Sequence, residues 1–401
     1  MVQRTPPFGG VLFRLPAGQL AIRAVPRAGA CSTLERARAD WEDVAVNTSP
    51  GTDPSSAAMA DGLSVGDVYE GRIIALLLKA FPAAAQAGSQ GDARVEVGPG
   101  DDAALVKLAT GRLLATVDTV VDGQDFLGIW PCGYATTGED VGYKSAAQNL
   151  SDINAMAARS TAALVALNLP KSTPLAWVEG YARGFARAAC ELGARDMSVI
   201  GGDLSAAGEL CASVTMLGEP VGPVALRTGA RPGDRVIVAG EVLGRADVSL
   251  RMLLSSDREN RTDVWGELEE KVSRGLFEPH PPLMLGPAVA GRVSALMDVS
   301  DGLVADGRRL AKASGVGLDL SPEALESEAA ELASWGGRHV THGLEHVLFG
   351  GEDHLLLGTS SADFPVPDGF RQLGVVVEGE GLLLDGKPLT GALGFDHFSN
   401  T

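Results

Sequence analysis

The chain has 401 residues, of which 45% are hydrophobic and 21% are charged. These are the proportions of an ordinary globular protein, so they exclude a disordered or fibrous chain. The 51 acidic residues outnumber the 33 Lys and Arg residues, and the formal net charge is −18. Because so acidic a chain repels other polyanions, we expect no nucleic acid and no membrane among its partners.

The 4 cysteines are widely spaced, and none belongs to a Cys-x-x-Cys pair. This pattern argues against a zinc ribbon and against a disulfide framework. No apolar run approaches the ~18–20 residues that a membrane span requires. We therefore expect a cytoplasmic protein whose cysteines are free thiols.

Composition along the chain predicts an N-terminal extension followed by two domains. Residues 1–58 carry scattered Arg and Pro residues, and their last part, NTSPGTDPSSAA at 47–58, has the composition of a flexible linker. We expect a poorly ordered extension at 1–58, a first domain at 59–220 and a second at 221–401. The segment GEPVGP, 218–223, provides the boundary between the two domains.

Short apolar runs that predict strands alternate with segments of helical periodicity. In chain order, helices are predicted at 65–80, 139–158, 175–192, 282–292 and 301–314. Strands are predicted at 104–108, 112–117, 197–200, 211–217, 235–238, 295–299, 354–357, 374–377 and 382–384. The segment 255–274 is dense in charge of both signs, which is typical of a solvated helical excursion. Both halves mix strands with helices, which predicts an α+β or α/β architecture in two domains.

Carboxylates recur where apolar segments end, where a strand begins, or within an apolar helical pattern. They are Asp101, Asp102, Asp118, Asp152, Asp203, Asp298 and Asp301. Charges in such places are costly unless they are paired or bind a metal, and the nearby Lys and Arg residues are too few to pair them all. Carboxylate oxygens with few His or Cys neighbours favour Mg²⁺ or Ca²⁺ over zinc.

Glycines beside these acids would let the backbone approach a bound phosphate closely. They occur in GGD at 201–203 and in GGED at 350–353, while SDG at 300–302 opens a predicted helix, where free N–H groups favour phosphate. The sequence has no Walker-type phosphate loop, no protein-kinase signature set and no Gly-x-Ser-x-Gly elbow. His339, His342 and His346 have the spacing of one helix face, but no carboxylate or thiol motif accompanies them, so a zinc site is not favoured there.

In order and spacing, several blocks of this sequence resemble the thiamine-monophosphate kinase family. That family belongs to a superfamily that includes aminoimidazole ribonucleotide synthetase and selenophosphate synthetase. The resemblance runs from about residue 63 to residue 398. The blocks are GPGDDAAL (98–105), LLATVDTVVDGQDF (113–126), VGYKSAAQNLSDINAM (141–156), VIGGD (199–203), LRTGARPGD (226–234), PHPPLMLG (279–286), MDVSDGL (297–303), LFGGEDHLLL (348–357) and GFDHF (394–398).

Three positions depart from the family's common pattern. Family members often have Ala-Val directly before Asn-Leu-Ser-Asp, whereas Gln148 precedes Asn149 here. Family members also often have Ser-Thr-Asp or Thr-Thr-Asp where this chain has Thr116-Val117-Asp118. Val117 has no side-chain oxygen, so a metal contact there would use its backbone carbonyl. His354 replaces the tyrosine that commonly follows Gly-Gly-Glu-Asp.

The resemblance implies transfer of the γ-phosphoryl group of ATP to thiamine monophosphate, with Mg²⁺ as the cofactor and thiamine diphosphate as the product. The implied magnesium ligands are Asp101, Asp102, Thr116, Val117, Asp118, Asp152, Asp203, Asp298 and Asp301. The implied nucleotide contacts are Gly202, Asp203, Arg227 and Ser300, and the implied thiamine monophosphate contacts are Asp125, Glu352 and Phe395. Among these, Asp118, Asp152 and Asp203 would be the catalytic residues.

The resemblance also implies a two-domain synthetase-like fold. Its N-terminal β-sheet domain, at 59–220, would bind ATP and Mg²⁺ and form a barrel within a homodimer, and its C-terminal domain would be α/β. ATP and a phosphate monoester together carry about six negative charges. An aspartate-lined pocket would repel both unless divalent cations bridged the carboxylate and phosphate oxygens.

Two alternatives stay open at this point. One is another ATP-dependent enzyme of the same superfamily, such as an amidine-forming synthetase of purine metabolism. The other is a non-catalytic nucleotide-binding module, whose mark would be the loss of several of these aspartates, which this chain retains. An acidic calcium-binding scaffold is disfavoured because the EF-hand spacing is missing.

Overall fold

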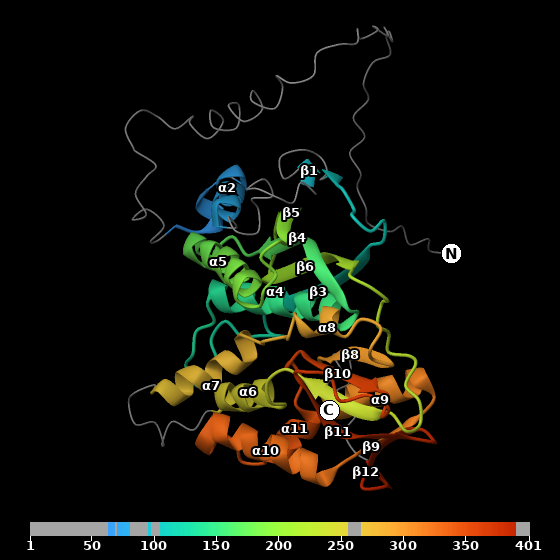
Figure 1. Ribbon diagram of the computed structural model, residues 1–401. Coiled ribbons are helices and arrows are strands. Elements are labelled where there is room, and N and C mark those ends of the chain that lie inside the picture. The colour runs from blue at the N-terminus through green and yellow to red at the C-terminus, as the bar shows by residue number, and fades with distance from the viewer. Residues whose placement is uncertain (1–62, 69, 81–94, 98–104, 256–265, 390–401) are drawn as a thin grey trace, which may run out of the picture. The chain divides into compact units, whose positions relative to one another are not determined.

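The computed structural model describes residues 63–68, 70–80, 95–97, 105–255 and 266–389, which lie in one compact unit, Ser56–Thr401 (Figure 1). These residues form a mixed arrangement of helices with two-, four- and seven-stranded sheets, so the predicted mixed α/β class is confirmed. The predicted extension at 1–58 lies outside the described residues. In the described ranges, no helix combines the length and the apolar character needed to cross a membrane.

The first half of the described chain is built around a four-stranded sheet of order β3-β6-β4-β5. Only the β4–β5 pair is parallel. Strands β1 and β2 form a separate antiparallel pair. The elements are η2 (Val65–Asp67), α2 (Glu70–Ala80), β1 (Val95–Val97), β2 (Leu105–Val106), β3 (Leu114–Val121), α4 (Gly138–Ala155), β4 (Ala158–Leu169), α5 (Leu175–Glu191), β5 (Ser198–Ala206) and β6 (Cys211–Pro220).

Helix α4 is buried over nearly its whole length and packs closely against α5. It begins with a capping box in which the Thr137 and Asp140 side chains each accept from the other's backbone N–H. Side chains on Gly142 and Gly184 would overlap backbone carbonyls of the opposite helix. These glycines therefore let the two helix backbones approach each other, and they hold α4 between α5 and the sheet.

The sequence prediction missed strand β4 because it continued the preceding helix to residue 158. The helix ends at Ala155, and Ala157 has a left-handed backbone with φ of 57°, which reverses the chain. β4 then runs through an alanine-rich segment that has little β-branched character of its own. Its place between β6 and β5 makes it a strand, because pairing and burial override local propensity.

The second half is built around a seven-stranded sheet of order β13-β12-β9-β11-β7-β10-β8. All neighbouring pairs are antiparallel except β12 with β9. The elements are β7 (Arg235–Ala239), α6 (Arg245–Leu254), α7 (Glu267–Phe277), α8 (Leu285–Ala288), β8 (Ala295–Val299), α9 (Leu303–Ser314), β9 (Gly317–Leu320), α10 (Pro322–Gly336), η3 (Gly337–His339), α11 (Gly343–Phe349), β10 (Leu355–Ser360), β11 (Phe370–Val377), β12 (Gly381–Leu384) and β13 (Lys387–Pro388).

Several element predictions were wrong in this half and at the start of the chain. The helix predicted at 65–80 is split into η2 and α2, and the one predicted at 282–292 is reduced to the single turn α8. Strand β9 and helix α6 were not predicted. The three histidines do not share a helix face, since His339 ends η3, His342 caps α11 and His346 is buried within it. The charge-rich segment at 255–274 contains the start of α7, and its residues 256–265 lie outside the described ranges.

Each of the two larger sheets has an apolar core. Tyr181 and Phe185 of α5 pack with Met216 of β6 in the first, and Val238 of β7 packs with Leu310 of α9 in the second. Helices α6 and α7 also contribute side chains to the first core. The domain limits at 59–220 and 221–401 stay a prediction.

Candidate functional site

The inner face of β3 presents two polar side chains to helix α4. Burial alternates along β3, so Thr116 and Asp118 face inward while Val117 faces outward with 60% of its surface exposed. Thr116 Oγ1 donates a 2.6 Å hydrogen bond to Oδ2 of Asp152 on α4. The backbone N–H of Asp118 donates to Oδ1 of Asn149, 3.1 Å away. These bonds fix two predicted magnesium ligands, Asp118 and Asp152, beside each other.

A third carboxylate comes from the second half of the chain. Asp298 on β8 is buried, and its charge acts on both Asp118 and Asp152. Ser151 Oγ of α4 lies 3.5 Å from Oδ2 of Asp298. Helix α4 and strands β3 and β8, far apart in the sequence, thus bring three of the predicted ligands together.

Burial and repulsion by neighbouring acids make it costly to ionise Asp152 and Asp118. Burial, followed by the charges of Asp298 and Asp118, raises the pKa of Asp152 from 3.8 to about 7. Burial also raises the pKa of Asp118. A divalent cation would relieve this repulsion, and carboxylate oxygens are the ligands that Mg²⁺ prefers, so this donor set fits Mg²⁺. Within the described ranges, no group of three or more His, Cys, Asp and Glu side chains is placed so that it could hold a metal ion. In this arrangement the three acids alone therefore do not make a metal site.

Glu352 lies beside this cluster and is held by a buried lysine. Lys144 of α4 is 1% exposed, and its Nζ lies 2.6 Å from Oε2 of Glu352. Burial alone would raise the pKa of Glu352, but the charges of Lys144 and His354 outweigh it and hold this pKa well below its usual range. Glu352 is therefore a carboxylate at neutral pH.

His354 lies between two acids of the site. Its Nδ1 is 3.5 Å from Oδ2 of Asp298, and its Nε2 is 3.7 Å from Oε2 of Glu352. Both distances are longer than hydrogen bonds but within the range of ion pairs. Burial alone would lower the pKa of His354, but these two carboxylates outweigh it and raise this pKa to about 10. His354 is thus an imidazolium at neutral pH.

Asp125 follows β3 in the turn after the strand. Its Oδ2 accepts a 2.7 Å hydrogen bond from the backbone N–H of Val121, and its charge acts on Asp118. The predicted substrate contacts Asp125 and Glu352 therefore both lie within electrostatic range of the cluster.

The structure separates Asp203 from the three clustered acids. β6 and β4 lie between β3 and β5, so β3 and β5 are three strand spacings apart, about 14 Å. Across these strands, the residue of β5 that aligns with Asp118 is Gly202. By the same register Asp203 falls in the row of Thr119, on the outer face of the sheet, and it is exposed. Its Oδ2 accepts a 3.0 Å bond from Ser205 Oγ. A Cβ on Gly202 would overlap the carbonyl of the adjacent strand, so glycine is needed there.

The turn after β8 carries Ser300 and Asp301. Their backbone N–H groups donate to Oδ2 of Asp306, at 3.0 and 2.9 Å. Arg309 Nη1 lies 2.5 Å from Oδ2 of Asp301 and 2.6 Å from Oδ1 of Asp306. Asp301 is therefore already paired with a cation.

The other predicted residues add nothing to the cluster in the described ranges. Arg227 is exposed, and its carbonyl accepts from Ser314 Oγ at 3.0 Å. Asp101, Asp102 and Phe395 lie outside the described residues. The outward direction of Val117 leaves only its backbone near the inner face.

Four residues that contact the cluster or Glu352 were not predicted: Lys144, Asn149, Ser151 and His354. Lys144 and Asn149 precede Asp152 by eight and three residues, which is helical spacing, and Ser151 lies seven residues after Lys144; these polar positions in a buried helix were an available signal. For His354, the departure from the common tyrosine was the signal.

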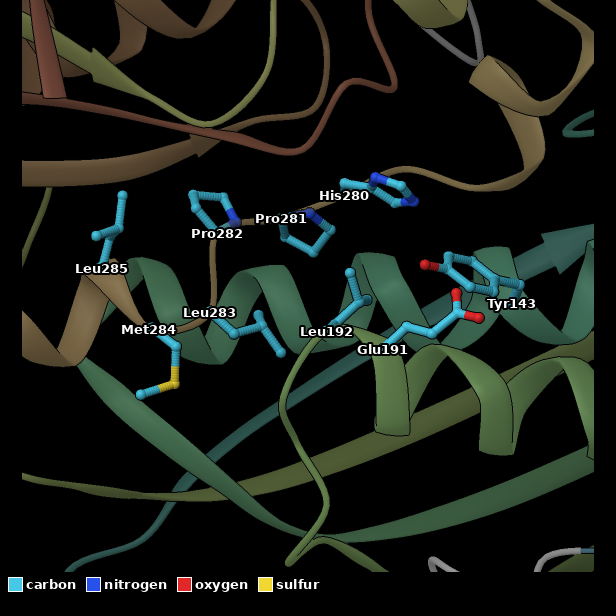
Figure 2. Close-up of a pocket in the computed structure, with 9 residues that line it drawn as sticks. All are labelled: Tyr143, Glu191, Leu192, His280, Pro281, Pro282, Leu283, Met284 and Leu285. Atoms are coloured by element: carbon cyan, nitrogen blue, oxygen red, sulfur yellow. The ribbon is translucent and has the colours of Figure 1, made fainter. Parts of the chain in front are cut away.

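A separate hollow of about 330 Å³ is lined by Tyr143, Glu191, Leu192 and residues 280–285, whose side chains Figure 2 shows. Its walls are mostly apolar, and the Tyr143 hydroxyl and the Glu191 carboxylate stand at one end. None of the predicted site residues lines it.

The chain matches the family model described as AIR synthase related protein, N-terminal domain, over residues 100–219. It is 38% identical over 315 residues to the thiamine-monophosphate kinase of Mycobacterium tuberculosis, covering 78% of this chain and 88% of that protein. It is 34% identical over 301 residues to the thiamine-monophosphate kinase of Aquifex aeolicus, covering 75% and 92%.

Solved structures agree with these relatives. AaThiL complexed with AMPPCP and TMP superimposes with a TM-score of 0.62 at 32% identity, over 74% of this chain and 91% of that one. The thiamine-monophosphate kinase from Stenotrophomonas maltophilia gives a TM-score of 0.63 at 30% identity, over 79% and 96%. Sequence and fold together show that this chain belongs to the thiamine-monophosphate kinase family.

Proposed function

We propose that this enzyme transfers the γ-phosphoryl group of ATP directly to the phosphate of thiamine monophosphate, forming thiamine diphosphate and ADP. Two findings on relatives support these substrates: the activity named for relatives at 38% and 34% identity, and the AMPPCP and TMP bound to AaThiL. The observation on this chain that carries the proposal is the cluster of buried Asp298 with half-buried Asp118 and Asp152, on which the charge of Asp298 acts.

Mg²⁺ would be held by Asp118, Asp152 and Asp298, with Thr116 orienting Asp152. Bound there, it would neutralise phosphate charge next to the carboxylates. Because these three acids alone do not make a metal site in the described ranges, phosphate oxygens of the substrates would have to complete the ligand set. Asp101, Asp102, Asp203 and Asp301, with the carbonyl of Val117, stay further ligand proposals. Gly202, Asp203, Arg227 and Ser300 stay nucleotide-site proposals.

The acceptor is already an anionic oxygen, so the reaction needs no strong general base. The protein's own residues would align an oxygen of the thiamine monophosphate phosphate in line with the bond between the γ-phosphorus and the ADP oxygen. As a new bond forms between that phosphate oxygen and the γ-phosphorus, the bond between the γ-phosphorus and the ADP oxygen breaks, and its electron pair leaves on ADP. No covalent enzyme intermediate is required.

Glu352 and Asp125 would bind the organic part of the acceptor, with Phe395 as a further contact. Thiamine monophosphate carries a cationic thiazolium and an aminopyrimidine, both of which suit carboxylate partners. Lys144 and His354 keep Glu352 ionised, so its charge is available to a cationic ligand.

A homodimer through the outer face of the four-stranded sheet is part of the proposal. Val117 is 60% exposed and Leu164 37% exposed on that face, and both align with Thr215 of the strand between them. Exposed apolar side chains on a sheet face are typical of an interaction surface, and a second copy of the chain provides a matching one.

The direct test incubates the purified protein with ATP, Mg²⁺ and thiamine monophosphate and measures thiamine diphosphate by chromatography. We expect stoichiometric ADP and thiamine diphosphate from the wild type and none from Asp118→Asn. ATP hydrolysis without thiamine diphosphate, or equal product from the variant, would contradict the proposal.

A further inference from the structure

The imidazole ring of His354 lies between two acids that have different proposed functions. His354 is 5% exposed, and its two ring nitrogens lie 3.5 Å from Asp298 and 3.7 Å from Glu352. Asp298 belongs to the proposed magnesium cluster, and Glu352 to the proposed acceptor site. A shift of either carboxylate therefore changes the surroundings of the ring that contacts the other.

Helix α4 closes this arrangement into a ring of contacts. Lys144 pairs with Glu352 at 2.6 Å, while Ser151 Oγ lies 3.5 Å from Asp298 and 3.3 Å from the carbonyl of His354. Lys144 and Ser151 are seven residues apart, about 10 Å along the helix axis. The helix thus fixes both ends of the series Glu352, His354, Asp298.

The backbone around His354 has little freedom to adjust. Glu352 and His354 both have left-handed conformations, with φ of 67° and 55°, which are unfavourable for residues other than glycine. Their N–H groups donate to the carbonyls of Ser300 at 2.7 Å and Val299 at 2.8 Å. The main chain at both residues is therefore held to the end of β8, while the side chain of His354 contacts both Asp298 and Glu352.

We propose that His354 is a positioning residue that couples the two substrate sites, so that binding of the nucleotide with its cation at Asp298 raises the affinity for thiamine monophosphate at Glu352. The inference rests on the proposed function. Couplings of this kind typically change affinity by 5–150-fold, and we expect about tenfold here.

The test measures, by calorimetry, the Kd of thiamine monophosphate with and without AMPPCP and Mg²⁺. The wild type should bind about tenfold more tightly when both are present. His354→Phe keeps a ring but removes both nitrogens, and we expect its coupling to fall below twofold, with a raised KM for thiamine monophosphate and a smaller change in kcat. The matched control is His346→Phe, which removes another buried histidine, one that pairs with Asp247 at 2.7 Å outside the site. It should keep the wild-type coupling.

Unchanged coupling in His354→Phe, or equal loss of coupling in His346→Phe, would overturn the inference. If His354→Phe does not fold, the same coupling is measured in His354→Asn. Asparagine tolerates the left-handed backbone, but its side chain is too short to reach both acids. A coupling reduced at least threefold in that variant supports the inference, and wild-type coupling refutes it. A wild type that forms thiamine diphosphate without any coupling refutes this inference alone, whereas a wild type that forms none refutes the proposed function.

Discussion

Replacing Asp152 by Asn should stabilise the metal-free protein at alkaline pH while abolishing turnover. In the folded protein the pKa of Asp152 is raised from 3.8 to about 7, by burial and then by Asp298 and Asp118. The folded state therefore holds a proton on Asp152 more tightly than the unfolded chain does. The stabilisation from this proton is fully present below about pH 4, declines as the pH rises, and is lost above about pH 7.

The size of the effect follows from this difference in pKa. The interval from 3.8 to about 7, at ~1.4 kcal/mol per pH unit, corresponds to on the order of 4 kcal/mol in the free energy of unfolding. Asn is neutral at every pH and can still accept the hydrogen bond from Thr116 Oγ1. With ~2 cal/mol/K of unfolding entropy per residue over Ser56–Thr401, 4 kcal/mol corresponds to roughly 6 °C in Tm.

The assay is thermal unfolding of wild type and Asp152→Asn from pH 5 to pH 8.5, in chelator and in Mg²⁺. In chelator, the difference in Tm should grow in favour of the variant as the pH rises and level off above about pH 7. Mg²⁺ should raise the Tm of the wild type at pH 8 and leave that of the variant nearly unchanged. A variant that is less stable than wild type at pH 8 in chelator, and that gains equally from Mg²⁺, would refute the reasoning.

Four further outcomes are expected. The affinity for Mg²⁺ should rise with pH up to about 7 and binding should release protons, because Asp152 must ionise; calorimetry in two buffers of different ionisation enthalpy detects this, and binding without proton release counts against it. Glu352→Gln should raise the KM for thiamine monophosphate ~10-fold or more, since a bond to a charged group contributes ~1.5–3 kcal/mol, and should leave the Kd of AMPPCP measured without thiamine monophosphate within twofold; steady-state kinetics and calorimetry decide. Val117→Glu should convert a dimer into monomers by sedimentation, with Val117→Thr as the matched control, and a dimer in both variants would exclude this face. Gly202→Ala should destabilise by ~2 kcal/mol or more in chemical unfolding, because a Cβ would overlap the Val165 carbonyl, and wild-type stability would show that the strands can separate.

The sequence carried enough information to locate the centre of the candidate site. In the sequence, apolar runs lead into Asp118 and Asp298, and Asp152 interrupts an apolar helical pattern, so each was identifiable as a charge that needs compensation. The structure brings these three acids together. Asp203 follows the same strand-end pattern, yet the register of β5 puts it on the outer face. Local pattern thus identifies a costly charge but does not reveal which face of the sheet it occupies.

Contacts between the two halves of the chain were the part that sequence could not provide. Lys144 and Glu352 are separated by 208 residues, and their pairing depends on how helix α4 meets the end of β8. The same holds for His354, whose two carboxylate partners become neighbours only through the fold. The loss of β4 from the prediction has a related cause, because an alanine-rich segment becomes a strand only when β5 and β6 pair with it.

The most direct test of the central claim is the position of divalent cations in a crystal of the protein with AMPPCP, thiamine monophosphate and Mn²⁺ in place of Mg²⁺. Anomalous scattering identifies the Mn²⁺ sites independently of the protein model. We predict peaks within about 2–2.5 Å of carboxylate oxygens of Asp118, Asp152 and Asp298, shared with phosphate oxygens. Bound nucleotide with no anomalous peak at these three acids would contradict the account.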